Sequence, residues 1–313
     1  MKRLISLLAV ICLIFNLSGC KNTKSVQKTV FAMDTVMDLQ LWGSDASQAA
    51  DALSSLFAEL DGTWSATKTN SVTSQLNSRE GVSLNEAQKN LLEKAEALSQ
   101  RTGGAFNPKL LSVSKAWGFY EKEHRIPTEN EITAALGESN WDLGAALKGY
   151  AGDQAVKLLE GQNVDRAILN LGGNIQTYGQ KADKTPWQIG IQHPRNTNYI
   201  GIVSVVGTCA VVTSGDYQRY FEENGVRYHH IMNPETGYPA DSGLSSVTVI
   251  CKDGLTADAL STALFVMGLA ESISFWRNSD DFEAVFITTE GTVYATEGAA
   301  LSGCEYEVIA REN

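Results

Sequence analysis

Apolar residues recur at helical spacing in four stretches of the chain and alternate or cluster as in strands in several others. The helical stretches are Ala46 to Leu60, Asn85 to Gln100, Ala145 to Leu159 and Ala257 to Met267. Strand-like runs are Thr35 to Leu41, Ala167 to Leu171, Trp187 to Ile191, Gly201 to Val206, Cys209 to Val212, Arg219 to Glu222, Val226 to Ile231, Ser245 to Cys251 and Ala284 to Ile287. Since strands outnumber helices and often follow one another directly, the pattern predicts an α+β fold with largely antiparallel sheets flanked by helices.

The N-terminal segment has a different pattern. Lys2 and Arg3 precede an apolar run that ends at Leu17, and small residues stand just before Cys20. This order is typical of a bacterial export segment, and Leu17-Ser18-Gly19-Cys20 resembles a lipobox, which implies a lipid on Cys20. The alternatives are an uncleaved anchor helix and an ordinary secretory segment. We expect residues 1–19 to be a removed lipoprotein signal peptide, residues 20–29 a polar tether, and residues 30–313 a single domain.

Charge and cysteine content narrow the function. The 313 residues include 25 Lys plus Arg and 36 Asp plus Glu, a net charge of −11. Because a phosphate backbone demands a basic surface, a nucleic-acid partner is excluded. The five cysteines form no CxxC motif and no cluster with histidine, so a zinc site is not expected either. We expect the last three cysteines to be mostly buried thiols.

Lys148 stands near the predicted start of a helix, in the segment from Asp142 to Ala151. A cation in a first helical turn opposes the helix dipole, so it suits a position where an anion docks. A solvated lysine on an ordinary helix explains the same residue equally well.

Asp258 and Thr262 are four residues apart in a predicted helix, so their oxygens share one face. Thr256 is the expected N-cap, and Asp258 in the first turn then has a simple interpretation as a residue that stabilises the helix dipole. The alternative is a magnesium site, since a carboxylate, a hydroxyl and a backbone carbonyl are hard oxygen ligands.

Eight segments resemble, in order and spacing, the ApbE-type flavin transferases, which are FAD:protein FMN transferases. They are Met33 to Thr35, Gly104 to Pro108, Asp142 to Asp153, Asn170 to Asn174, Trp187 to Pro194, Thr213 to Phe221, His230 to Pro239 and Ala257 to Gly268. The resemblance implies an ApbE-type α-β roll with a cofactor cleft between two subdomains. It also implies magnesium-dependent transfer of the FMN moiety of FAD to a threonine, sometimes serine, hydroxyl of an acceptor protein, with release of AMP.

Site residues follow from the same resemblance. The implied metal ligands are the side chains of Asp258 and Thr262 and the carbonyl of Ala145. Lys148 and Asp258 are implied in catalysis, and His230 is expected to orient or deprotonate the acceptor hydroxyl, since histidine usually titrates near neutrality. Implied FAD contacts are Met33, Thr67, Ala105, Phe106, Asn107, Asp142, Lys148, His230 and Met232.

Several positions depart from the family pattern. Asp34 replaces a glycine, Asn107 and Asn233 replace aspartates, and Ser261 stands where some members carry another metal-binding aspartate. We expect the last change to weaken or rearrange the metal site.

The expected setting is outside the cytoplasm, with the chain anchored by lipid to the cell membrane and acting on flavoprotein subunits of extracytoplasmic redox complexes. Two other functions remain open. One is hydrolysis of FAD to FMN and AMP, and the other is binding of FAD without catalysis.

Overall fold

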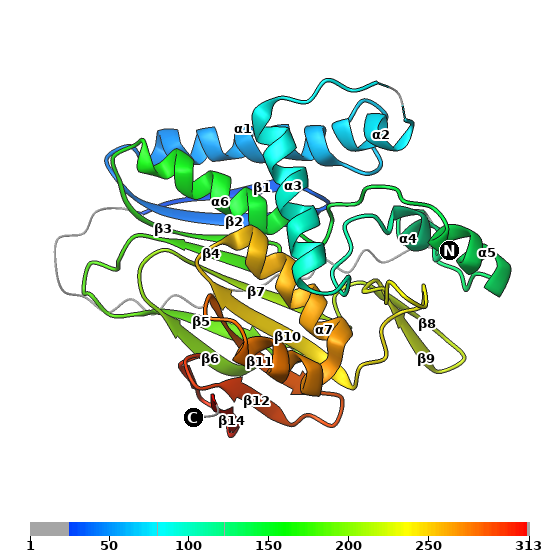
Figure 1. The fold of residues 1–313 in the computed structure, drawn as a ribbon. Coiled ribbons are helices and arrows are strands. Elements are labelled where there is room, and N and C mark those ends of the chain that lie inside the picture. The colour runs from blue at the N-terminus through cyan, green and yellow to red at the C-terminus, as the bar shows by residue number, and fades with distance from the viewer. Residues whose placement is uncertain (1–24, 80, 122, 312–313) are drawn as a thin grey trace, which may run out of the picture.

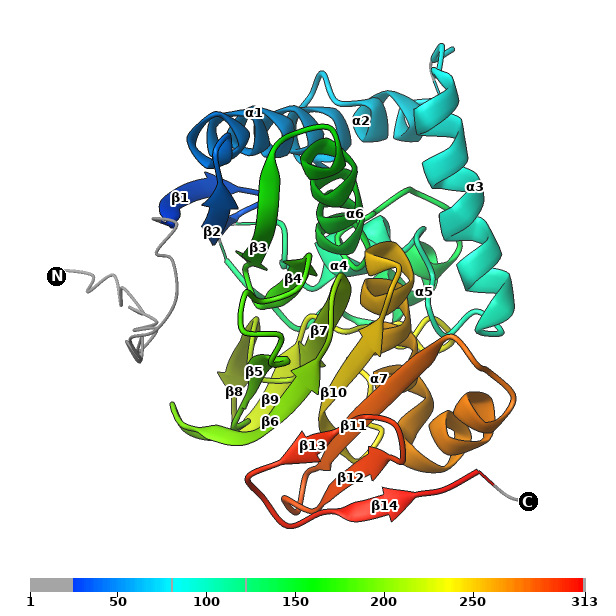
Figure 2. The ribbon, with the colours of Figure 1, turned by 90° about the vertical axis from the view of Figure 1, so that its left-hand side faces the viewer.

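The computed structural model describes residues 25–79, 81–121 and 123–311, and Figures 1 and 2 show its fold. Its main sheet has nine strands in the order β1-β2-β3-β4-β7-β10-β11-β12-β14. Neighbouring strands are antiparallel except β12 and β14, which are parallel. These strands are β1 (Val26–Ala32), β2 (Thr35–Gly43), β3 (Val164–Leu171), β4 (Asn174–Tyr178), β7 (Cys209–Gly215), β10 (Leu244–Cys251), β11 (Phe282–Thr288), β12 (Val293–Thr296) and β14 (Glu307–Ile309).

Helices cover one face of the main sheet and a smaller sheet covers part of the other (Figure 2). The long helices are α1 (Ala46–Trp64), α3 (Glu86–Arg101), α6 (Leu147–Glu160) and α7 (Gly254–Arg277). The smaller sheet has the order β13-β6-β5 and consists of β5 (Trp187–Gln192), β6 (Tyr199–Val205) and β13 (Leu301–Ser302). The fold is therefore α+β with largely antiparallel sheets, as predicted.

Two-residue alternation in the strands creates the layers. In β2, Met37, Leu39 and Leu41 are buried against the helices, while Val36 and Asp38, which face the other side, are exposed. In α1, buried residues such as Leu53, Phe57 and Leu60 recur at helical spacing and face the same core. The side chains on the other face of the sheet form a separate core with the small sheet, including Trp187, Val203, Val285 and Ile287.

A side lobe flanks the end of the main sheet. It consists of α4 (Leu111–Ala116) and α5 (Glu129–Leu136), which pack against a ribbon of β8 (Tyr220–Glu223) and β9 (Val226–His229). Trp117 is fully buried there, and its Nε1 donates a hydrogen bond of 2.8 Å to the carbonyl of Gly237. Because this bond joins residues 120 apart in sequence, it ties the lobe to the loop that follows β9.

The predicted helices and strands are confirmed; most boundaries shift by a few residues, and α7 continues ten residues beyond the predicted end at Met267, to Arg277. Asn224 and Gly225 both have positive φ and join β8 to β9 in a two-residue hairpin turn, a position that favours Asn-Gly. Cys209 and Cys251 are buried free thiols, as expected, and Cys304 is half-buried.

The boundary predicted for the tether is wrong. Residues 26–29 belong to β1, which pairs along its whole length with β2, so these four residues are part of the fold and not of a tether. The polar side chains of this segment misled the prediction, because one face of this edge strand is exposed. The signal peptide and residues 20–24 lie outside the described residues. The sequence reading also missed α2 (Val72–Asn77), α4, α5, β4, β12, β13 and β14, all of them eight residues or shorter.

Helix α7 is long and apolar enough to cross a membrane, the one such helix in the described part of the chain. It is nevertheless a core helix, since more than half of its residues are buried and it packs on β7, β10 and β11. It is kinked at Gly268, whose φ of 77° falls outside helical geometry.

Candidate functional site

Two turns lie against each other at one end of the main sheet, and one of them holds the predicted site residue Met33. The β1–β2 turn holds Met33 and Asp34, both with positive φ, and the β3–β4 turn holds Gly172 and Gly173. A Cβ on Gly172 would lie 2.4 Å from the Thr35 hydroxyl, so only glycine allows the two turns to approach this closely. Met33 is half-buried against the core beneath the turn.

Asp142 is held in a network just before α6. The Tyr120 hydroxyl lies 2.8 and 2.7 Å from its two carboxylate oxygens, and the Gly144 amide donates a bond of 2.9 Å to Oδ1. Burial raises the pKa of Asp142, and these hydrogen bonds oppose the rise. Asp34 contributes to the raised pKa of Tyr120, which places the β1–β2 turn beside this network.

Arg219 is a site residue that the sequence reading missed. Its Nη2 donates a hydrogen bond of 2.7 Å to the carbonyl of Phe119, and its guanidinium lies 5.9 Å from the centre of the Tyr120 ring. Its charge lowers the pKa of both Asp142 and His230. The one signal for Arg219 in the sequence is its positive charge at the start of a predicted strand, within the segment Thr213 to Phe221.

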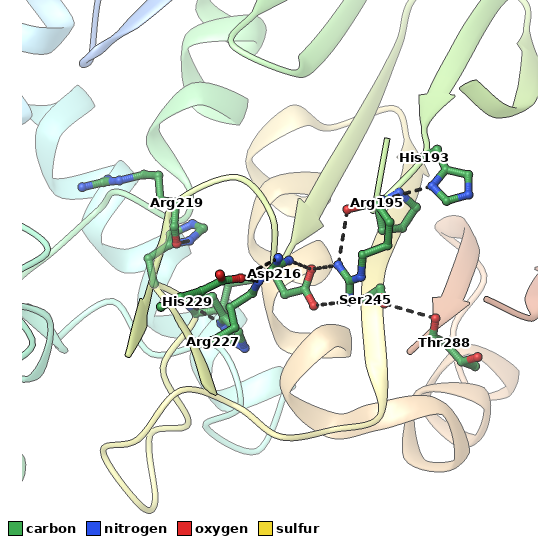
Figure 3. Close-up of polar contacts among 12 residues, drawn as sticks. His193, Arg195, Asp216, Arg219, Arg227, His229, Ser245 and Thr288 are labelled. Carbon is green, nitrogen blue, oxygen red and sulfur yellow. Dashed lines mark hydrogen bonds and ion pairs between the residues drawn. The ribbon is translucent and has the colours of Figure 1, made fainter. Parts of the chain in front are cut away.

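An ion-pair network fixes the loop that carries Arg219 (Figure 3). Asp216 accepts hydrogen bonds of 2.6 and 2.7 Å from the two terminal nitrogens of Arg195, and Arg195 also donates to Ser245 at 2.9 Å. Arg227 approaches the same carboxylate at 3.7 Å. These contacts join the β5–β6 loop, β9 and β10 to the end of β7. They hold the start of the loop after β7 in position.

The two adjacent histidines point in different directions, as strand alternation predicts. His229 is buried, and its Nε2 lies 3.1 Å from the carbonyl of Ala240. The amide of His230 donates to the Arg219 carbonyl at 3.0 Å, and its Nδ1 lies 3.2 Å from the same oxygen. Because a carbonyl only accepts, Nδ1 carries the ring proton and Nε2 keeps its lone pair.

The expectation that His230 titrates near neutrality is wrong. Burial, followed by the charges of Arg219, His229 and Lys148, lowers its pKa from 6.5 to about 3. His230 is therefore neutral at physiological pH and a weak base, which suits hydrogen bonding and orientation of an acceptor hydroxyl better than full proton abstraction.

This pKa can be measured directly. In a pH titration of the apoprotein followed by nitrogen-15 NMR, we expect the His230 ring to stay neutral down to a pH of about 4. Since the folded pKa lies below the unfolded value, the neutral ring stabilises the fold above pH 6.5, and this contribution is lost as the pH falls toward 3. A midpoint near 6.5 would contradict this assignment.

Lys148 is the second residue of α6, near the helix start that the sequence predicts. Lys148 is half-buried, and its ammonium group has no hydrogen bond or ion pair to any of the described residues; burial lowers the pKa of His230 most, and the charge of Lys148 lowers it further. The Lys148 amide also donates no hydrogen bond to the described residues, whereas the Gly149 amide donates to Asp258. An unpaired cation beside a free amide in a first helical turn is an arrangement that attracts an anion.

Asp258 joins α7 to the start of α6. The residue is 4% exposed, and its Oδ2 accepts a hydrogen bond of 2.8 Å from the Gly149 amide. The N-cap of α7 is Asp253, which accepts from the Thr256 amide, so the predictions of Thr256 as the N-cap and of Asp258 in the first turn are wrong. The helix begins three residues earlier than predicted, and the interpretation of Asp258 as a cap is no longer available.

A backbone oxygen nearby is also free. Gly149 is the third residue of α6, so its amide has no partner within the helix and donates to Asp258 instead. The Ala145 carbonyl accepts no hydrogen bond from the described residues, and Asp258 Oδ1 has no hydrogen-bond partner among them either. Thr262, one turn along α7 from Asp258, adds a half-buried hydroxyl.

These atoms form a donor set that fits magnesium. A carboxylate oxygen, a carbonyl oxygen and a hydroxyl oxygen are hard ligands, and magnesium usually completes its shell with water and substrate phosphate. The described residues contain no group of three or more His, Cys, Asp or Glu side chains that could hold a metal ion, so the set has only one charged ligand. It therefore suits a metal that also binds a phosphate.

The remaining predicted FAD contacts are placed as follows. Thr67 is exposed in the α1–α2 connection, where its hydroxyl lies 3.1 Å from that of Ser65. Phe106 is 1% exposed and packs in the main core, and its amide donates a hydrogen bond to the Thr102 hydroxyl. Asn107 accepts a hydrogen bond from the Lys109 amide, and Met232 is buried in the side lobe. Ala105 is half-buried next to Phe106.

One cavity in the described part of the chain lies away from the predicted site residues. It has a volume of about 230 Å³ between α3 and the start of α7, and its lining includes Lys94, Arg101, Asp253 and Thr256 but none of the predicted site residues. The cofactor cleft between two subdomains stays a prediction.

Comparison with known proteins identifies the family of this chain. The model of the ApbE family matches residues 33–286. The FAD:protein FMN transferase of Treponema pallidum is 29% identical over a 334-residue alignment that covers 93% of this chain and 92% of the relative. That of Klebsiella pneumoniae is 35% identical over 221 residues, covering 63% and 68%.

Solved structures agree as well. The crystal structure of the ApbE protein from Thermotoga maritima superposes with a TM-score of 0.82 at 31% identity, covering 88% of this chain and 97% of that one. The apo flavinyl transferase ApbE of Pseudomonas stutzeri has a TM-score of 0.77 at 27% identity, covering 88% and 95%. A match over most of the chain, in sequence and in fold, shows that this chain belongs to the ApbE family.

Proposed function

We propose that this chain transfers the FMN moiety of FAD to a threonine or serine hydroxyl of an acceptor protein and releases AMP. The observation that carries the proposal is the meeting of α6 and α7, where the unpaired Lys148 lies beside the free oxygens of Asp258 and Ala145. A cation and a metal-binding oxygen set at one helix end suit a diphosphate. The names of the relatives, FAD:protein FMN transferase, supply the class of diphosphate and of acceptor.

The reaction is a substitution at phosphorus. The acceptor oxygen bonds to the phosphorus of the FMN half, the bond from that phosphorus to the bridging oxygen breaks, and AMP leaves with this oxygen. The hydroxyl proton is released as the new bond forms. Such a reaction needs alignment and charge neutralisation more than a protein nucleophile.

Each residue has a defined part in this proposal. Asp258, Thr262 and the Ala145 carbonyl hold magnesium, which would polarise the attacked phosphorus and stabilise the charge on the leaving AMP. The side chain of Lys148 and its free backbone amide at the start of α6 would bind the diphosphate. His230 accepts a hydrogen bond from the acceptor hydroxyl at Nε2 and orients it, while Arg219 holds the histidine ring through its carbonyl.

The proposal can be tested with the full chain purified in detergent. Mixed with FAD, magnesium and a candidate acceptor domain, it should increase the acceptor mass by one FMN group. An acceptor in which the target threonine is replaced by valine should remain unlabelled. An unlabelled acceptor and intact FAD would mean that the chain only binds the flavin.

Lys148→Ala tests the anion site. We expect the variant to bind FAD more weakly by about 1 to 3 kcal/mol, the range for a charge-assisted contact, with an apoprotein as stable as the wild type or slightly more so. Lys157→Ala removes an exposed lysine from the last turn of the same helix and should leave FAD affinity unchanged. Equal affinity of the Lys148 variant and wild type, measured by titration, would make Lys148 an ordinary surface lysine.

The site is proposed to work outside the cytoplasm, held to the membrane by lipid on Cys20, with flavoprotein subunits of redox complexes as acceptors. What supports this location is the lipobox sequence Leu17-Ser18-Gly19-Cys20, which precedes the described residues. Cys20→Ala should move the protein from the membrane fraction to the soluble fraction. The fold is acidic and offers no basic surface to a membrane, so attachment depends on the lipid. Purified activity should be unchanged. A variant that stays in the membrane as firmly as wild type would contradict the anchor.

A further inference from the structure

The hydroxyl of Thr262, a proposed metal ligand, belongs to a row of three hydrogen-bonded hydroxyl groups. Ser214, at the end of β7, lies 2.8 Å from Ser261 and 3.3 Å from Thr262, oxygen to oxygen. Ser261 in turn donates to the Asp258 carbonyl at 2.9 Å. We infer that Ser214 and Ser261 fix the proton of Thr262, so that the Thr262 oxygen presents its lone pairs to the metal. This inference rests on the proposed function, because Thr262 is a ligand only there.

The direction of each hydrogen bond follows from counting protons. A carbonyl only accepts, so Ser261 gives its single proton to Asp258. Ser214 must then donate to Ser261, since the Ser261 proton is already used. With the Ser214 proton used as well, Thr262 is the donor in the third bond. The Thr262 proton therefore points toward β7, and the lone pairs of its oxygen are left for a cation.

Burial keeps this order in place. Ser261 is 0% exposed and Ser214 is 8% exposed, so water has little access to compete for these bonds. The chain of bonds ends on the backbone of Asp258, whose side chain is another proposed metal ligand. Ser214 and Ser261 are thus positioning residues that join β7 to two ligands on α7.

The arrangement gives a role to a position where this chain differs from some family members. Ser261 replaces an aspartate that binds metal in those members, but here its hydroxyl faces Ser214 and the backbone. In this proposal Ser261 positions Thr262 through Ser214 and is not itself a metal ligand. The hydroxyl chain thus orients Thr262 in a site that has only one carboxylate.

The affinity for a metal tests this inference without relying on activity. Mn²⁺ is titrated into the full chain in detergent, with FAD present, and free Mn²⁺ is followed by electron paramagnetic resonance. We expect Ser214→Ala to weaken Mn²⁺ binding about tenfold, the lower end of the range for residues that orient a metal ligand. Ser261→Ala should also weaken Mn²⁺ binding. Without the Ser261 hydroxyl, Ser214 can donate its proton to Thr262, which reverses the direction of that hydrogen bond.

A matched control removes a neighbouring hydroxyl from the same pair of strands. Thr248 on β10 lies 2.8 Å from Thr213 on β7, oxygen to oxygen, and successive strand residues face opposite sides of the sheet. Thr248→Val should therefore bind Mn²⁺ like the wild type. Melting temperatures of all three variants separate a loss of folding from a loss of metal affinity.

The outcomes are distinct. If Ser214→Ala and Ser261→Ala, both folded, bind Mn²⁺ within about twofold of wild type, the hydroxyl chain does not orient a ligand and the inference fails. Such a failure leaves the proposed function standing as long as the wild type labels an acceptor. A wild type that transfers FMN but binds no Mn²⁺ overturns both the metal site and the inference.

Discussion

Asp258→Asn is expected to fold normally and to transfer FMN at less than about one hundredth of the wild-type rate. Asparagine keeps the shape of the side chain and one oxygen that can accept from the Gly149 amide, so the link between α6 and α7 survives. What is lost is the negative charge on a proposed metal ligand. A bound metal supplies several kcal/mol of charge stabilisation in the transition state, and about 2.7 kcal/mol is a hundredfold in rate.

The same substitution on the same helix provides the control. Asp253 is the N-cap of α7, and asparagine is about as good an N-cap as aspartate, so Asp253→Asn should keep most of the transfer rate. Both variants are assayed over a range of magnesium and manganese concentrations, where high metal should partly rescue only Asp258→Asn. Near wild-type transfer with unchanged magnesium dependence in that variant would remove Asp258 from the metal site.

Gly149→Ala is expected to destabilise the fold by about 1 to 3 kcal/mol, even though alanine is the better helix former. Helices α6 and α7 cross there backbone to backbone. A Cβ on Gly149 would lie 2.0 Å from the Gly254 carbonyl oxygen and 2.7 Å from the Asp258 Cβ. The helices must separate, which lengthens the bond from Gly149 to Asp258 and lowers transfer as well.

A glycine on an open helix surface gives the opposite expectation. Gly62 in α1 has no atom within 4 Å of the position that a Cβ would take, so Gly62→Ala should stabilise the protein by up to about 1 kcal/mol. Urea unfolding of both variants measures the difference. Equal or greater stability of Gly149→Ala would show that the crossing has room for a methyl group, contrary to the structure.

Sequence periodicity predicts the parts of the fold whose apolar pattern is strong. Helices α1, α3 and α6 each bury a regular face, which regular spacing reveals, whereas β10 and the first half of α7 are almost entirely buried and show as apolar runs. Short elements such as α2 and β13 are held by contacts with distant segments. In β1 the inner residues are only half-buried at an exposed edge, so the strand looked like a polar tether.

Some residues of the candidate site could likewise be predicted from the sequence, and others could not. Lys148, Asp258 and Thr262 could be chosen from the sequence because each stands in a helix at a defined spacing. Arg219 could not, because its relation to Tyr120 and His230 depends on how the loop after β7 folds back on the side lobe. The low pKa of His230 depends on burial and on three cationic or titratable neighbours, two of which are distant in sequence. Asp258, which accepts from the Gly149 amide more than 100 residues earlier in the chain, reaches the start of α6 only through the packing of α7 on α6.

The ratio of AMP released to FMN bound tests most directly whether the chain is a transferase. The full chain in detergent is incubated with FAD and magnesium, with and without a candidate acceptor, and both products are quantified by chromatography and intact mass. Transfer predicts one AMP for each FMN bound to the acceptor and almost no AMP when the acceptor is absent. AMP and free FMN formed at the same rate without an acceptor would contradict the account, because water would then be the true nucleophile.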